Sequence, residues 1–125
     1  MKEEAKKWLE KAKSDLKHAK HSLKDNDFDW VQVASQQSAE KALKAVCLHK
    51  EAGLIKVHDL TILARKVNAP DEILENCSLL NPFYTASRYP DIEKETDKKL
   101  EKAAAKDAIK AAGRVATWCK RQIKT

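Results

Sequence analysis

Five polar side chains that could bind a ligand or a partner lie within one short stretch of the chain. They are Gln36, Gln37, Glu40, Lys41 and Lys44. Amide, carboxylate and ammonium groups together can donate and accept hydrogen bonds and can neutralise charge on a bound molecule. The stretch predicts a helix, and residues four apart on a helix share a face, so Gln36 should lie beside Glu40 and Gln37 beside Lys41.

The same stretch predicts the central helix of the fold. Residues 30–50 contain no Gly or Pro, and residues 39–48 are apolar on most of the helix circumference. A helix that is apolar on several sides usually has other helices packed around it. A buried amide or carboxylate without a partner costs on the order of 1–3 kcal/mol. The polar cluster must therefore be matched by another helix, another subunit or a ligand.

A second polar group follows late in the chain. It comprises Arg88, Tyr89 and Asp91, with Pro90 between the last two. A guanidinium, a phenol and a carboxylate at a rigid turn could bind a phosphate, stack on a base or pair across an interface. Arg88 could equally reach Glu40 and form an internal ion pair.

His58 lies directly before Asp59, which can cap the start of a short helix. A histidine at a helix start usually closes a loop by hydrogen bonding, and the alternative is a contact with a ligand. His18 and His21 are expected on the exposed, lysine-rich side of the first helix.

Periodic apolar residues predict an all-α fold, an up-and-down antiparallel bundle of about five helices, three long and two short. The long helices are predicted over residues 2–24, from about 28 to a stop at Gly53, and over about 100–124. One short helix is predicted over about 60–67. The other follows Asp71 as a candidate cap and reaches about residue 80, with a kink or restart at Asn81–Pro82.

The chain has 125 residues, and we expect a single domain over residues 1–125. Only 2 Gly and 3 Pro, with 35% charged residues, are typical of a helical bundle and also of proteins from thermophiles. The net charge of +6 comes from lysines, which commonly form solvated helix faces, whereas phosphate recognition favours arginine. Charge alone therefore gives only weak support to nucleic-acid binding.

The three cysteines, Cys47, Cys77 and Cys119, fall on apolar stripes of predicted helices. They form no C-x-x-C pair, and no cysteine and histidine have the spacing of metal ligands. The cysteines therefore predict buried thiols in a reducing compartment rather than a metal site. The N-terminal residues lack the apolar core of a signal sequence, and no stretch has the length of a membrane span. We expect a cytoplasmic protein without membrane association.

Several motifs of catalysis and cofactor binding are missing from the sequence. Two glycines cannot form a glycine-rich phosphate loop, and neither the Glu-x-x-His motif of di-iron bundles nor a nucleophile elbow occurs. The residues themselves therefore predict no metal site, no cofactor and no catalytic set.

Four short motifs follow one another along the chain. They are A-x-x-W-L-x-x-A-x-x-D-L at 5–16, S-Q-Q-S-A-E-K-A-L-K-A at 35–45, V-H-D-L at 57–60 and R-Y-P-D at 88–91. In this order and spacing, over about residues 5–120, they resemble the HEPN family of higher eukaryote and prokaryote nucleotide-binding domains. The resemblance implies a bundle of about five helices that commonly dimerises. It also implies a small protein that is often encoded beside a minimal nucleotidyltransferase, in a toxin–antitoxin-like system.

Some HEPN proteins are metal-independent ribonucleases whose sites use an arginine followed, after four to six residues, by a histidine, paired across the dimer. Every histidine of this chain precedes every arginine, the last histidine being His58 and the first arginine Arg65. The ribonuclease motif is therefore absent, and cleavage would require His58 to lie beside Arg88 in space.

Three functions remain as alternatives. The one we favour is a binding module that dimerises and engages a nucleotidyltransferase, a nucleotide or RNA through a polar groove. The residues of that groove are Gln36, Gln37, Glu40, Lys41, Lys44, His58, Arg88, Tyr89 and Asp91. The others are a ribonuclease with a non-standard His58/Arg88 site, and a purely structural bundle in which the same residues form an internal network.

Overall fold

The computed structural model describes residues 3–53, 56–86 and 97–124, and this part of the chain contains six helices and no strand. The long helices are α1 (Glu3–Lys24), α2 (Phe28–His49) and α6 (Lys98–Lys124). The short helices are α3 (Leu60–Lys66), α4 (Asp71–Leu80) and α5 (Pro82–Ala86). The predicted all-α bundle is confirmed, and the expected restart at Asn81–Pro82 separates α4 from α5.

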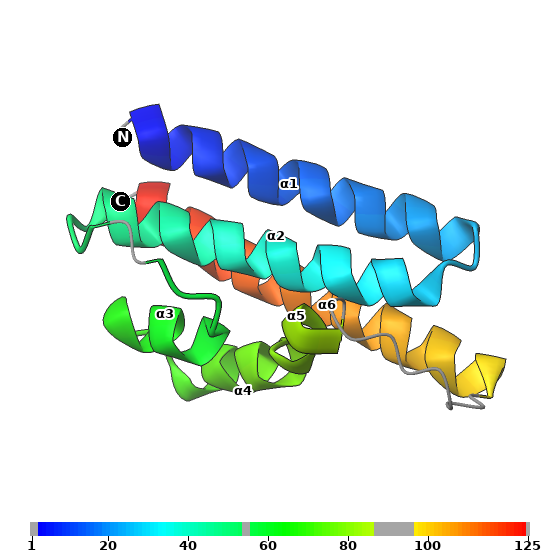
Figure 1. Ribbon diagram of the computed structural model, residues 1–125. Helices are drawn as coiled ribbons and strands as arrows, with labels where there is room; N and C mark the ends of the chain where they lie inside the picture. Colours follow the sequence, from blue (N-terminus) through cyan, green and yellow to red (C-terminus); the bar gives the residue numbers. More distant parts are fainter. Residues whose placement is uncertain (1–2, 54–55, 87–96, 125) are drawn as a thin grey trace.

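Helix α2 is the central element, because it contacts each of the other five helices (Figure 1). The hairpin partner α1 runs along one side of it, α6 lies along another, and the short helices α3, α4 and α5 gather on a third (Figure 1). Most α2 residues are buried, including the whole run from Ala42 to Cys47. The predicted central helix is therefore confirmed.

Small residues let α1 approach α2 closely. The buried residues of α1 are Ala5, Ala12 and Ala19, which repeat every seven positions along one face. The hydroxyl of Ser38 on α2 donates a hydrogen bond of 2.6 Å to the carbonyl oxygen of Ala12. A direct bond from a short side chain to the neighbouring backbone fixes the position of α1 along α2 as well as its distance.

The predicted helix ends agree with the structure in part. Asp59 caps α3 as expected, since its carboxylate accepts hydrogen bonds from the backbone N–H groups of Thr61 and Ile62. Asp71 is not a cap: Pro70 holds the N-cap position in an extended conformation, and Asp71 is the first residue of α4. Helix α2 ends at His49, before the expected stop at Gly53, although Gly53 does adopt a positive φ of 83°.

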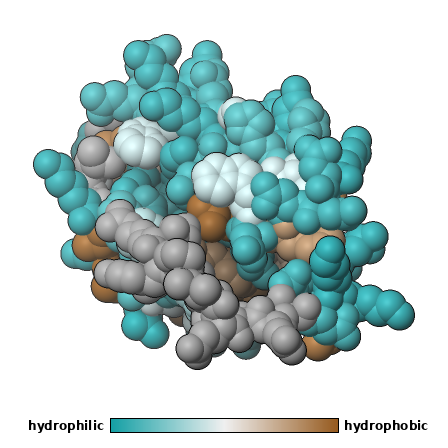
Figure 2. All heavy atoms as spheres, turned by 45° about the vertical axis from the view of Figure 1, so that its right-hand side comes forward, coloured by the Kyte–Doolittle hydropathy of each residue, from teal (hydrophilic) through white to brown (hydrophobic). Residues whose placement is uncertain are grey.

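The face of the molecule in Figure 2 carries mainly hydrophilic side chains among its described residues, with small apolar patches between them. The large apolar side chains that remain exposed include Trp30 on α2 and Leu100 on α6. None of the helices in the described ranges is both long enough and apolar enough to cross a bilayer.

The three cysteines are free thiols, and all three are completely buried. They come from α2, α4 and α6 and belong to one apolar core. Burial raises the pKa of each thiol, because a thiolate loses its hydration there. For Cys77 the pKa is raised from 9.0 to about 12.

Alkaline pH should destabilise the fold through Cys77. Above pH 9.0 the unfolded chain releases the thiol proton, whereas the folded chain keeps it up to about pH 12, so rising pH favours unfolding. We expect Cys77 alone to reduce the free energy of unfolding by about 1.4 kcal/mol at about pH 10. Urea unfolding at about pH 8 and about pH 10 measures the loss. The variant Cys77→Ala should lose less over this interval, and equal losses in the two proteins would contradict the assignment.

Candidate functional site

Glu40 lies at the centre of a hydrogen-bonded network on α2. The Nε2 atom of Gln36 donates to Glu40 Oε1 at 3.2 Å, and the ammonium of Lys44 donates to Glu40 Oε2 at 3.0 Å. Because the three residues are spaced by four, the helix itself places the amide and the ammonium on either side of the carboxylate. Only 12% of the Glu40 side chain and 8% of the Lys44 side chain are exposed, so this is a largely buried ion pair.

His58 completes the network from the loop before α3. Its Nδ1 atom lies 3.1 Å from each oxygen of the Glu40 carboxylate, and its backbone carbonyl oxygen accepts a 3.5 Å bond from Gln36. An ionised carboxylate can only accept, so the geometry assigns the proton to Nδ1. The imidazole ring stacks on Tyr84 of α5, with centroids 4.3 Å apart and planes 16° from parallel. The His58 side chain is 47% exposed, so the network reaches the surface here.

On its other side the network reaches α1 through Lys44. The Lys44 ammonium lies 5.7 Å from the centroid of the Trp8 ring, within the range of a cation–π interaction, and Lys11 lies at 5.8 Å from the same ring. A shallow pocket of about 450 Å³ adjoins Trp8 and Leu48. The side chains from Trp8 to Tyr84 therefore form a continuous chain of contacts across α1, α2 and α5, which we call the Glu40 strip. Its members are Trp8, Gln36, Glu40, Lys44, His58 and Tyr84.

One atom of the strip lacks a partner among the described residues. Gln36 is completely buried, and its Oε1 atom accepts no hydrogen bond. A buried acceptor without a donor costs on the order of 1–3 kcal/mol. The hydroxyl oxygen of Ser35, on the same helix, is likewise without a partner.

The other predicted site residues have different surroundings. Lys41 forms an ion pair with Asp15 of α1 rather than with Glu40, and Gln37 is partly buried one turn before it. Arg88, Tyr89 and Asp91 lie outside the described residues, so their part in the site and the Arg88–Glu40 pair stay predictions. Of the nine predicted residues, Gln36, Glu40, Lys44 and His58 are brought together.

Sequence reasoning missed three side chains that complete these contacts, namely Trp8, Asp15 and Tyr84. Trp8 and Asp15 stand in the motif at 5–16, and Tyr84 follows the Asn81–Pro82 break, so each position carried a signal. Their partners lie 26 or more positions away, beyond what helical periodicity can relate.

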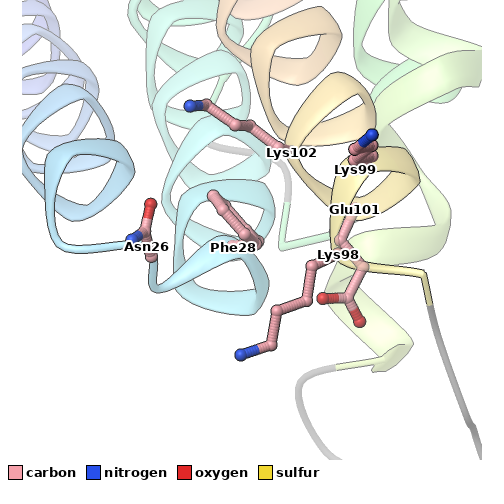
Figure 3. A pocket seen from close by; sticks show the side chains of 6 residues that line it. All are labelled: Asn26, Phe28, Lys98, Lys99, Glu101 and Lys102. Carbon is pink, nitrogen blue, oxygen red and sulfur yellow. The ribbon is translucent and has the colours of Figure 1, made fainter.

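A separate pocket of about 280 Å³ lies where the α1–α2 turn meets the start of α6 (Figure 3). Its lining residues are Asn26, Phe28, Lys98, Lys99, Glu101 and Lys102. None of them was predicted as a site residue. In the part of the chain that the structure covers, no group of three or more His, Cys, Asp or Glu side chains could hold a metal ion.

Comparison with known proteins gives a consistent result. The model of the HEPN domain family matches residues 5–122. A crystallised archaeal HEPN homologue is 30% identical, with a TM-score of 0.81 over 98% of this chain and 99% of the other. A Thermus thermophilus protein is 28% identical, with a TM-score of 0.84 over 97% and 99% of the two chains. An HEPN domain protein of Thermotoga maritima, at 23% identity, shares the fold with a TM-score of 0.78 over 94% and 97%. Among curated proteins no match was found.

Proposed function

The chain belongs to the HEPN domain family, and on this premise we propose that it is a binding module whose ligand docks on the Glu40 strip. The observation that carries the proposal is the way the strip ends. The Glu40–Lys44 pair is largely buried, but the network continues to a half-exposed imidazole that stacks on Tyr84. An internal network that served stability alone would gain from burying this end as well.

A protein surface is the ligand that this charge distribution favours. Lys44 is paired with Glu40 and Lys41 with Asp15, so a phosphate would have to compete with a carboxylate for either ammonium. The family resemblance suggests two partners, a second copy of the chain in a homodimer and a minimal nucleotidyltransferase in a toxin–antitoxin-like system. The buried free thiols fit the reducing cytoplasm in which such a system would act.

A nucleotide or RNA is the second candidate ligand. The stacked rings of His58 and Tyr84 could extend their stack onto a base. The same histidine supports a ribonuclease as an alternative function, since an imidazole oriented by a carboxylate resembles a general base. Arg88, the cation that this alternative needs, is outside the described residues.

Binding can be measured with the protein as it is. Trp8 touches Lys44, so its fluorescence should respond when ATP or a short RNA binds the strip, and sedimentation velocity measures self-association. For whichever probe binds, we expect His58→Ala to weaken the interaction by about tenfold, or about 1.4 kcal/mol. His18→Ala, which removes an exposed histidine of α1, is the matched control and should bind like the wild type.

A second variant and a check for RNA cleavage distinguish the binding function from the ribonuclease. Tyr84→Leu should weaken binding as His58→Ala does, and a melting curve for each variant shows that the loss is not one of folding. RNA recovered from the titration should be intact, whereas cleavage that disappears in His58→Ala would favour the ribonuclease. Equal affinity in His58→Ala and wild type, with both folded, would contradict docking on the strip.

A further inference from the structure

The side chain of Asn81 joins two segments that lie far apart in sequence. Its Nδ2 atom donates a hydrogen bond of 2.9 Å to Asp59 Oδ1, and its Oδ1 atom accepts one of 2.7 Å from the backbone N–H of Leu60. Asn81 stands between the end of α4 and the start of α5, and Asp59 and Leu60 form the start of α3. Both ends of one amide are thus engaged by one helix start.

The direction of these bonds is fixed by Asp59. Its Oδ1 atom also accepts from the Thr61 hydroxyl at 2.6 Å and from the Thr61 N–H at 3.0 Å. Hydrogen bonds from the side chains of Thr61 and Asn81 lower the pKa of Asp59, so the group is a carboxylate that can only accept. Asn81 must therefore present its N–H to Asp59 and its oxygen to Leu60, and it cannot be flipped.

This bridge, which we call the Asn81 clasp, joins residues that are close in sequence to the two stacked rings of the candidate site. His58 directly precedes Asp59, and Tyr84 follows Asn81 by three residues. The two stacked residues are therefore close in sequence to the two hydrogen-bonded residues, Asp59 and Asn81. If the clasp opened, the start of α3 and the residue before α5 would lose their direct hydrogen bonds. Among the interactions of the described residues, those with Tyr84, Gln36 and Glu40 would then hold His58.

We propose that Asn81 is a positioning residue of the site: its clasp with Asp59 and Leu60 holds the His58 imidazole against Tyr84, with Nδ1 on Glu40. A side chain that must contact a ligand works best when a second set of hydrogen bonds fixes its orientation. The inference rests on the proposed function for what the site binds, but the geometry it claims can be measured without any ligand.

The variant Asn81→Asp tests the clasp atom by atom. It keeps an acceptor for the Leu60 N–H, removes the N–H given to Asp59, and sets a second carboxylate against the first. In the wild type the stacked Tyr84 ring should shift the imidazole proton signals of His58 in an NMR spectrum. In Asn81→Asp we expect those signals to move to the positions of an exposed histidine such as His18, and any probe that binds the wild type to bind about tenfold more weakly.

The variant Asp59→Asn should leave both readouts as in the wild type, because its amide oxygen can still accept from Thr61 and Asn81. Asparagine is as good a helix N-cap as aspartate, so the start of α3 is kept. Asn68→Asp, at an exposed site after α3, controls for the added charge. A merely structural role would lower stability in Asn81→Asp without moving the His58 signals, and that result would overturn the proposal.

The two proposals fail separately. If the signals respond as expected while no probe binds even the wild type, the clasp stands and docking of these probes on the strip falls. If a probe binds the wild type but Asn81→Asp changes neither signals nor affinity, the positioning role falls and the binding function stands.

Discussion

Replacing Glu40 by alanine should lower the free energy of unfolding by about 3–5 kcal/mol, because it leaves a charge buried without its partner. Only 8% of the Lys44 side chain is exposed, so its ammonium cannot recover its hydration where it lies. Gln36 and His58 lose the Glu40 carboxylate as an acceptor at the same time. For a chain of this length the melting temperature should fall on the order of 10 °C. Urea unfolding followed by circular dichroism measures the change.

Two variants control this result. Removing both charges, in Glu40→Leu/Lys44→Met, should recover much of the loss, since no unpaired ion remains. Glu75→Ala, which deletes an exposed carboxylate on α4, should change stability by no more than about 0.5 kcal/mol. A loss below about 1 kcal/mol in Glu40→Ala would mean that Lys44 reaches water easily, and the network would then be a surface feature.

The second large effect is expected for Leu43→Ala, at about 2–5 kcal/mol. Leu43 is completely buried in the middle of α2, within the core shared with α3, α4 and α6. Because α2 contacts every other helix, no single neighbour can move in to fill the cavity without leaving another contact. The same unfolding experiment measures the loss. Ile62→Ala, at a side chain that is 43% exposed, should cost far less, and equal costs would refute the central position of α2 in the core.

The sequence was sufficient for the fold because each helix carries its own signal. The apolar circumference of α2 predicted its central place, and Asn81–Pro82 predicted the break before α5. The prediction that Asp71 caps α4 was wrong. Aspartate is favoured both at the N-cap and in the first turn, where it interacts with the helix dipole. Only the backbone distinguishes the two positions, and here Pro70 holds the cap.

The site was predictable only where helical spacing determines it. Gln36, Glu40 and Lys44 stand four apart, so their contacts follow from the helix alone. His58 meets Glu40, and Tyr84 meets His58, through the packing of a loop and a short helix, which no local pattern encodes. Lys41 shows the same limit: its spacing pointed to Gln37, while its ion pair is with Asp15 on another helix.

The most direct test of the account is to follow the imidazole NMR signals of the histidines during titration with ATP, with a short RNA and with increasing concentration of the protein itself. His58 reports on the Glu40 strip, and the exposed His18 and His21 of α1 serve as internal references. Docking on the strip predicts that each addition that binds moves the His58 signals and leaves those of His18 and His21 in place. Binding of any of the three that leaves the His58 signals unchanged would contradict it.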